Sequence, residues 1–89
     1  MIEKDIKITN RLGLHARAAS AFVQKAEQFS SKVEIEKDGV RINAKSIMGI
    51  LILAAPVNTE IKIIVSGEDE KMCMETLIEL VENKFGEEE

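Results

Sequence analysis

Two short alternating stretches, separated by Asp38 and Gly39, constrain the fold of this chain more than any other feature of its sequence. Apolar and charged residues alternate in VEIEK before this pair and in VRI after it. Such alternation is typical of strands with one buried face. An Asp-Gly pair accepts the positive φ angles of a tight two-residue turn. The sequence therefore predicts an antiparallel hairpin, and the fold must contain a sheet that includes it.

Two further strands are expected from the same kind of pattern. Ile6 and Ile8 alternate with a lysine near the start of the chain, and Ile61, Ile63 and Val65 alternate further on. One face of the resulting sheet is apolar and needs a covering layer. The opposite face is expected to carry its charges into solvent, namely Lys7, Glu34, Glu36, Arg41 and Lys62.

Three helices are expected to supply that layer. The first is predicted from Ala16 to Phe29, with an apolar stripe at Ala19, Phe22, Val23, Ala26 and Phe29. Periodicity leaves AKSIMGILILAAP ambiguous between strand and helix, but Ser46 as an N-cap and Pro56 as a stop favour a short helix. Asp69 is expected to cap the last helix. The inward-facing residues of that helix are expected to be Cys73, Leu77, Leu80 and Val81.

The predicted order is strand, helix, strand, strand, helix, strand, helix, which indicates an α+β fold with two layers. The length of 89 residues fits a single domain over residues 1–89. No internal repeat, low-complexity segment or linker divides the chain. Any chemistry should therefore lie near the surface of one small domain.

Composition argues against several classes of function. The net charge is −4 and Trp and Tyr are absent, so the chain lacks the basic surface and aromatic platforms of a nucleic-acid-binding protein. The single cysteine, Cys73, argues against disulfides and a cysteine-based zinc site, and no metal site or cofactor is expected. No segment has the pattern of a secretion signal or the length of a membrane span. A cytoplasmic protein without membrane insertion is expected.

The stretch RLGLHARAAS places the only histidine, His15, where a loop becomes the first turn of a helix. The unpaired backbone N–H groups and the dipole of a helix favour anions there. An imidazole can accept a phosphoryl group and release it again, and Arg17 offers a planar fork of donors to phosphate oxygens. The alternative is an ordinary surface histidine or helix cap. A catalytic enzyme is less well supported, because the sequence has no second histidine, Cys-His pair or Gly-rich phosphate loop.

Two motifs show a resemblance to a known family. GLHARA, followed about thirty residues later by NAKSIMGILILAA, resembles the histidine-containing phosphocarrier (HPr) family of the bacterial phosphoenolpyruvate-dependent sugar phosphotransferase system. The resemblance covers essentially the whole chain. It implies an open-faced sandwich in which a four-stranded antiparallel sheet is covered on one side by three helices.

The resemblance also implies a role for particular residues. His15 would be phosphorylated on Nδ1 by enzyme I and would pass the phosphoryl group to a IIA protein or domain. Arg17 would steady the phosphate, helped by the backbone amides of Ala16 and Arg17. Ser46 would match the regulatory serine that HPr kinase/phosphorylase modifies in many bacteria.

The short helix is apolar nearly all round and cannot bury every side chain. In the HPr family it forms part of the docking surface for enzyme I and IIA, and the matching residues here are Ile47, Met48, Leu51 and Ile52. A phosphate on Ser46 beside this surface would weaken docking by repulsion and desolvation. The alternative for Ser46 is that it only caps the helix.

The chain departs from the family pattern at three positions. Ala18 replaces the usual proline, which slightly loosens the start of the helix, and Ala54 and Asn58 stand where glycine is frequent.

Two other functions therefore stay open. One is a regulatory binding module that acts through Ser46 on a transcription factor or enzyme, although family members of that kind lack the histidine. The other is a small ligand-binding domain without phosphoryl chemistry. A carrier that presents one face to successive partners is expected to be a monomer.

Overall fold

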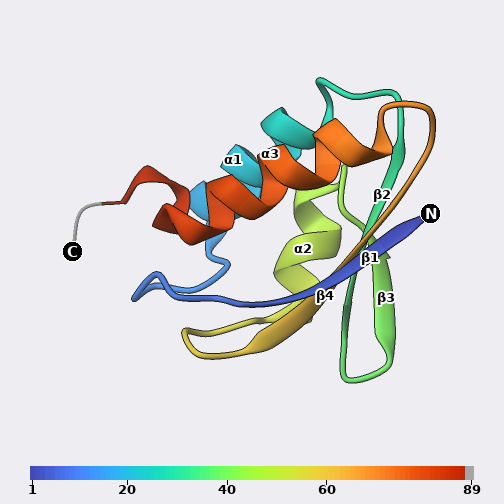
Figure 1. Ribbon diagram of the computed structural model, residues 1–89. Coiled ribbons are helices and arrows are strands. Elements are labelled where there is room, and N and C mark those ends of the chain that lie inside the picture. The colour runs from blue at the N-terminus through green and yellow to red at the C-terminus, as the bar shows by residue number, and fades with distance from the viewer. Residues whose placement is uncertain (88–89) are drawn as a thin grey trace.

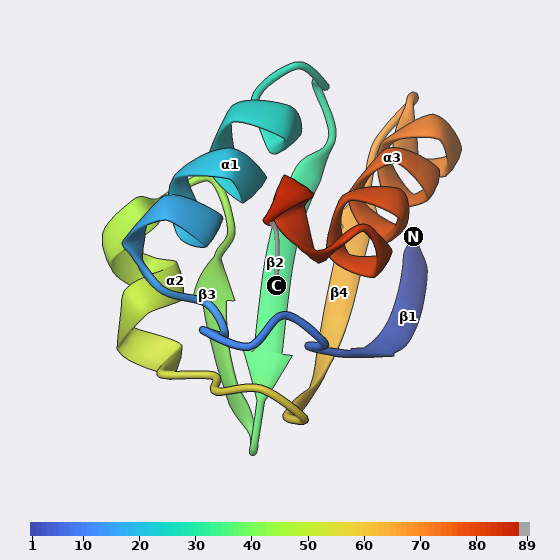
Figure 2. The same cartoon turned by 90° about the vertical axis from the view of Figure 1, so that its left-hand side faces the viewer.

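The computed structural model describes residues 1–87 and has the predicted order of strands and helices (Figure 1). The strands are β1 (Ile2–Lys7), β2 (Lys32–Lys37), β3 (Val40–Asn43) and β4 (Glu60–Ser66). The helices are α1 (Ala16–Ala26), α2 (Ile47–Leu53) and α3 (Glu70–Glu82), followed by the 3-10 turn η1 (Lys84–Gly86). The three helices lie on one side of the sheet, so the protein is an open-faced α+β sandwich (Figure 2).

The four strands form one antiparallel sheet in the order β1-β4-β2-β3. The predicted hairpin pairs Ile35 of β2 with Ile42 of β3. Its turn has positive φ angles at Asp38 (50°) and Gly39 (81°), as the Asp-Gly pair predicted. β4 lies between β1 and β2, which explains why it carries more buried apolar residues than the outer strands.

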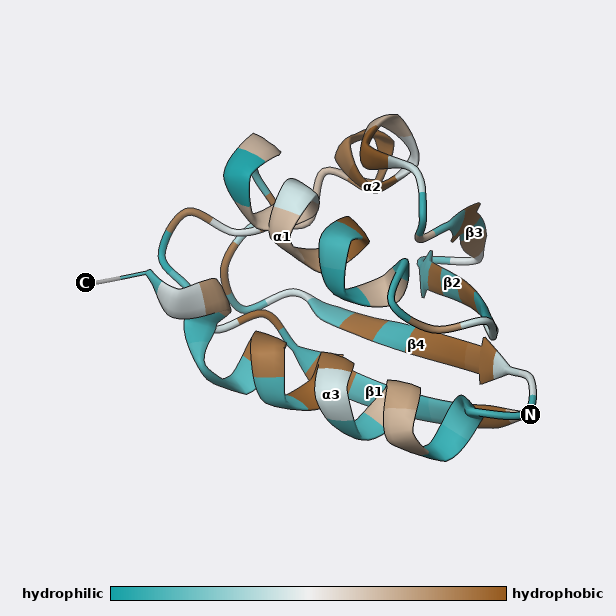
Figure 3. Cartoon of the chain, turned by 90° about the horizontal axis from the view of Figure 1, so that it is seen from above, coloured by the Kyte–Doolittle hydropathy of each residue, from teal (hydrophilic) through white to brown (hydrophobic). Residues whose placement is uncertain are grey.

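The core lies between the sheet and the helices, and its residues come from every layer. Phe22 of α1, Ile50 of α2, Ile35 and Ile63 of the sheet and Leu77 of α3 are all fully buried. In Figure 3, apolar residues (brown) alternate with polar residues (teal) along β4 and along the helices. Because aliphatic side chains from both layers meet, their burial is the main stabilising contribution to this fold. No helix within residues 1–87 is long and apolar enough to cross a membrane.

α1 ends three residues earlier than predicted. The helix stops at Ala26, and the amides of Gln28 and Phe29 donate to carbonyls only three residues back, at 3.1 and 3.2 Å. The prediction that the helix reaches Phe29 was therefore wrong. Phe29 still packs partly against the core, because a tighter turn carries its ring to the same side. Tertiary packing, rather than helical spacing, explains its apolar character.

The prediction that Asp69 caps α3 was also wrong. Asp69 stands at the N-cap position, but its side chain makes no capping hydrogen bond. Its carboxylate instead accepts from the backbone amides of Ser30 and Ser31, at 2.8 and 3.0 Å, and from both serine hydroxyls. Ser30 and Ser31, directly before β2, together offer the carboxylate four hydrogen-bond donors, whereas capping α3 would use a single helix amide. The carboxylate therefore joins two loops. These hydrogen bonds lower the pKa of Asp69, and the bond from the Ser31 hydroxyl has the largest effect.

The uncovered face of the sheet carries the predicted charges, but several are half-buried in ion pairs. Arg41 contacts Glu34 at 3.7 Å and Glu36 at 3.0 Å. Ile64 of β4 is also buried, although it lies outside the core cluster between the helices and the sheet. The long charged side chains of neighbouring strands explain this, because their aliphatic parts can cover an apolar residue.

Candidate functional site

His15 occupies the N-cap position of α1, at the junction of loop and helix where the sequence placed it. Its backbone is extended, with φ −77° and ψ 179°, and its Nδ1 accepts a hydrogen bond from the backbone N–H of Arg17 at 3.3 Å. The imidazole thus faces the first-turn amides, where a helix favours negative charge. Its side chain is 26% exposed, so the ring is accessible but held.

A close contact between two loops holds His15 in this place. Gly13 has φ +69°, and a Cβ atom there would lie 2.5 Å from the carbonyl oxygen of Ala55. The next amide, that of Leu14, donates to the same carbonyl at 2.9 Å. Only glycine permits this backbone approach, which explains the glycine two residues before the histidine. The contact joins the His15 loop to the segment that follows α2.

The two loops border a shallow hollow at the histidine. Its lining residues are Leu12, Leu14, His15, Ala54, Ala55 and Pro56. Arg17 is exposed, and within residues 1–87 no ion pair engages its guanidinium. The structure therefore places His15, the Ala16–Arg17 backbone and Arg17 at one end of α1, with a concave surface beside them.

The sequence analysis missed two further members of the site. The carboxylate of Glu87 contacts Nε2 of His15 through Oε2. Its other oxygen, Oε1, accepts from Nδ2 of the fully buried Asn10 at 3.1 Å, and Nδ2 also donates to the carbonyl of Gly13 at 2.7 Å. Glu87 is 72 residues from His15, so no local pattern could have shown the contact. In the sequence it was only one charge in a terminal acidic run.

Ser46 caps α2, as predicted. Its hydroxyl oxygen accepts from the backbone N–H of Gly49 at 3.0 Å. The other end of α2 is closed by Ala54 in a left-handed conformation, with φ 50° and ψ 58°. Asn58 also has a positive φ, 74°. Both positions where glycine was expected therefore adopt the conformation that glycine favours.

The apolar residues of α2 divide between the core and the surface. Met48 and Ile52 are 67% and 69% exposed, and Ile47 is 40% exposed. Leu51, by contrast, packs partly against the core. α2 packs against α1, the helix that His15 caps, and both helices lie on the same side of the sheet (Figure 2). We call Ile47, Met48 and Ile52 the α2 surface.

The described residues offer little support for a nucleophilic cysteine or for a metal site. Cys73 is buried among apolar residues of α3, and burial raises the pKa of its thiol to about 11, so it is a poor nucleophile. No group of three or more histidine, cysteine or acidic side chains is placed to hold a metal ion within the part of the chain that the structure describes.

Known proteins resemble this chain over nearly its whole length. The family model described as the phosphorylation site of the PTS HPr component matches residues 2–83. The phosphocarrier protein HPr of Xylella fastidiosa is 46% identical over 87 residues, which are 98% of this chain and 98% of the relative. The HPr-like protein Crh of Halalkalibacterium halodurans is 45% identical over 84 residues, or 94% of this chain and 100% of that protein.

Solved structures agree with the sequence relatives. A crystal structure of HPr-C-His from Thermoanaerobacter tengcongensis has a TM-score of 0.96 and 47% identity, with 100% of both chains covered. A second structure from that bacterium, described as an HPr dimer, has a TM-score of 0.79 and 47% identity, covering 98% of this chain and 100% of that one. Family model, relatives and structures coincide, and the chain belongs to the HPr family of phosphocarrier proteins of the phosphotransferase system.

Proposed function

We propose that this protein carries a phosphoryl group on Nδ1 of His15, from phospho-enzyme I to a IIA protein or domain. The observation that supports this most is the position of the imidazole as the N-cap of α1, with Nδ1 toward the Arg17 amide. In the transfer, the lone pair of Nδ1 attacks phosphorus. The bond that joins the phosphoryl group to enzyme I breaks, and its electron pair stays with enzyme I. The His15 ring keeps its Nε2 proton throughout.

The groups around Nδ1 suit the phosphorylated state. Once Nδ1 is bonded to phosphorus it can no longer accept a hydrogen bond, and the Arg17 amide becomes available to a phosphoryl oxygen. The amides of Ala16 and Arg17 belong to the first turn of α1, whose dipole favours an anion. The exposed Arg17 guanidinium is free to turn toward the same oxygens with two parallel donors.

Ser46 and the α2 surface make up the regulatory part of the proposal. The α2 surface, together with the partly buried Leu51, is the docking surface for enzyme I and IIA. Ser46 lies directly before it and is half-buried, so phosphorylation by HPr kinase/phosphorylase would add close to two negative charges at the edge of a docking interface. The result would be weaker docking, without any change at His15 itself.

Several broader features complete the proposal. Residues 1–89 form a single HPr domain that works in the cytoplasm as a monomer and needs no cofactor. It acts as a transiently phosphorylated carrier and catalyses no reaction on a separate substrate. A monomer leaves the His15 site and the α2 surface open to successive partners. Light scattering of the purified protein tests the oligomeric state directly.

The similarity to the Crh protein favours one alternative, a regulatory module that acts mainly through phosphorylated Ser46. The two functions differ in the residue that is modified. A carrier requires His15, whereas a regulatory module requires only Ser46 and a partner that recognises it. The histidine at position 15 supports the carrier.

The deciding experiment incubates the protein with enzyme I, Mg²⁺ and phosphoenolpyruvate and follows its mass. We expect one added phosphate that acid removes and that is absent from His15→Ala. A Ser46→Ala variant is the control and should be phosphorylated as the unchanged protein is. No transfer from an active enzyme I of the same cell would overturn the carrier function. The Crh-like function would then be tested with ATP and HPr kinase/phosphorylase.

A further inference from the structure

We propose that Glu87 is a positioning residue for His15: its carboxylate holds the Nε2–H of the imidazole and thereby keeps Nδ1 unprotonated and directed toward the start of α1. This inference rests on the proposed function, because it concerns the ring nitrogen that would receive the phosphoryl group. It assigns a chemical task to a segment at the far end of the sequence, beyond the residues 2–83 that match the family model.

The two nitrogens of His15 face opposite kinds of partner. Nδ1 lies 3.3 Å from a backbone N–H, which can only donate, and Nε2 contacts a carboxylate oxygen, which as an ion can only accept. A neutral imidazole satisfies both partners only when its proton is on Nε2. The lone pair of Nδ1 is then available to attack phosphorus. A carboxylate that fixes the tautomer and the orientation of a histidine is a general device of reactive sites.

The carboxylate also matches the charge that develops on the ring. When Nδ1 bonds to phosphorus and Nε2 keeps its proton, the imidazole ring becomes positively charged. An anionic oxygen in contact with Nε2–H stabilises that charge, and the effect is strong because the Glu87 side chain is only 10% exposed. The contact can therefore favour the transfer itself as well as the geometry before it.

Asn10 fixes the position of the Glu87 carboxylate. Its Nδ2 uses both hydrogens, one for the carbonyl of Gly13 and one for Oε1 of Glu87. With the amide oriented in this way, Oδ1 is buried and has no hydrogen-bond partner within the described residues. A buried acceptor without a partner is unfavourable. In this orientation Oδ1 of Asn10 forgoes a hydrogen bond, but Nδ2 holds the Glu87 carboxylate at the site.

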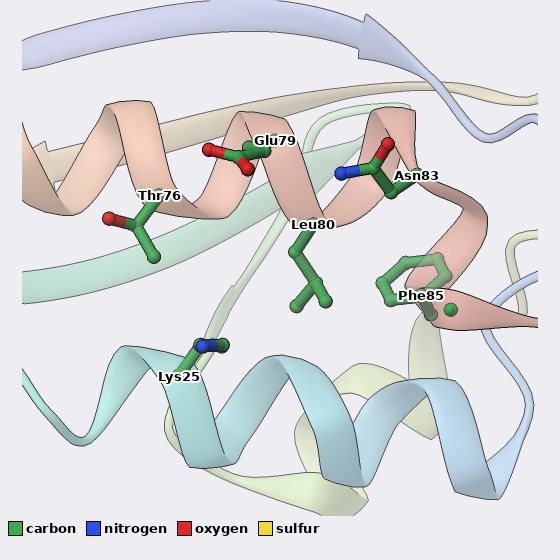
Figure 4. Close-up of a pocket in the computed structure, with 7 residues that line it drawn as sticks. Lys25, Thr76, Glu79, Leu80, Asn83 and Phe85 are labelled. Carbon is green, nitrogen blue, oxygen red and sulfur yellow. The ribbon is translucent and has the colours of Figure 1, made fainter.

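The backbone before Glu87 is bent to bring its side chain back to α1. Lys84, Phe85 and Gly86 have consecutive positive φ angles of 55°, 57° and 77°. Two of these residues are not glycine, so the turn is strained and needs support from the surrounding structure. The Phe85 ring supplies it by packing against the core, beside Leu80 on the side of α3 that faces α1 (Figure 4). Hydrogen bonds from the Gly86 amide to Asn83 and from the Glu87 amide to Lys84 close the turn.

The test compares Glu87→Ala and Glu87→Gln with the unchanged protein in two measurements. The first is the NMR signal of the His15 Nε2–H proton at pH ~9, where an ordinary imidazole is neutral. We expect a slowly exchanging signal in the unchanged protein, a weaker one in Glu87→Gln, whose amide oxygen still accepts, and none in Glu87→Ala. This measurement needs no phosphoryl donor, so it tests the positioning even if the proposed function fails.

The second measurement is the rate of His15 phosphorylation against the concentration of phospho-enzyme I. At metal sites, loss of the partner that orients a histidine typically costs about tenfold or more in activity. We expect Glu87→Ala to lower the maximal rate by about tenfold with an unchanged half-saturating concentration, and Glu87→Gln to fall between. Glu82→Ala, which removes an exposed glutamate at the end of α3, is the control and should change neither measurement.

Three results would each overturn the inference. One is an unchanged Nε2–H signal in Glu87→Ala. Another is a loss of rate that Glu82→Ala reproduces, because this would indicate net charge in place of position. The last is a raised half-saturating concentration with the same maximal rate, which would indicate that Glu87 contacts enzyme I. Failure of the unchanged protein to accept phosphate would concern the proposed function and leave the first measurement valid.

Discussion

The backbone of Ala54 adopts a conformation that is energetically unfavourable for alanine. At φ 50° and ψ 58° its Cβ crowds the following carbonyl, a penalty of roughly 1–2 kcal/mol that glycine escapes. Ala54 is exposed, so its methyl group contributes little packing. Glycine is also more flexible in the unfolded chain, which offsets about 0.4–1 kcal/mol of the gain. We expect Ala54→Gly to raise the free energy of unfolding by about 0.5–1 kcal/mol, measured by urea denaturation.

Ala21 in α1 is the matched control for this substitution. Ala21 lies within a regular helix, where the same change removes a good helix former. Ala21→Gly should therefore lower the free energy of unfolding by about 1 kcal/mol. Opposite signs at the two positions would show that backbone conformation decides the effect. A loss of stability in both variants would contradict the assignment of left-handed strain to Ala54.

At the scale of elements, the Asp69 carboxylate joins the start of β2 to the start of α3. Its hydrogen bonds from Ser31 and Ser30 lower the pKa of Asp69 in the folded protein. A group with a lowered folded pKa contributes its stabilisation fully above its unfolded pKa, near 4, and loses it as the pH falls through the lower value. We therefore expect the difference in unfolding free energy between the unchanged protein and Asp69→Asn to be constant from neutral pH down to about 5. It should shrink below about pH 4.

The measurement is urea denaturation of both proteins over that pH range. Glu75→Gln is the control, because it removes one acidic charge from α3 at an exposed position. The difference in unfolding free energy between Glu75→Gln and the unchanged protein should vary with pH in another way than the difference for Asp69→Asn. If the stability lost in Asp69→Asn stays constant down to pH ~2, where an ordinary aspartate is protonated, the ionised carboxylate is not the stabilising form.

For the molecule as a whole, the sequence predicted the features that depend on neighbouring residues. Asp38-Gly39 encodes its turn directly, and Ser46 bonds an amide three residues away. The fold class followed from the order of such local patterns. The errors arose where distant groups compete: Asp69 caps nothing because Ser30 and Ser31 offer more donors. Contacts between the two ends of the chain, such as that of Glu87 with His15, leave no local pattern at all.

The same limit applies to the site. His15 was proposed from the sequence because its type and its position before a helix carry chemical meaning. Asn10 was not singled out, since a buried asparagine in a turn sequence has the same appearance as an exposed one. The structure adds the part of the site that folding assembles: a loop contact, a buried amide and a returning carboxylate around one imidazole.

The α2 surface should affect transfer through docking, and two methionines with nearly equal exposure make a matched test. Met48 of the α2 surface is 67% exposed and Met72 of α3 is 65% exposed. Neither packs in the core, so aspartate at either position should leave the fold intact, and near the start of α2 an acidic residue even suits the helix dipole.

We expect Met48→Asp to raise the half-saturating concentration of enzyme I by about tenfold or more, because a charge in the docking interface must lose its water without a partner. Its maximal rate of His15 phosphorylation should stay the same, since no group around the imidazole changes. Met72→Asp should alter neither value. Equal effects from the two variants would mean that net charge governs the encounter. Such a result would contradict the proposed docking role of α2, and it would not bear on the proposed carrier function of His15.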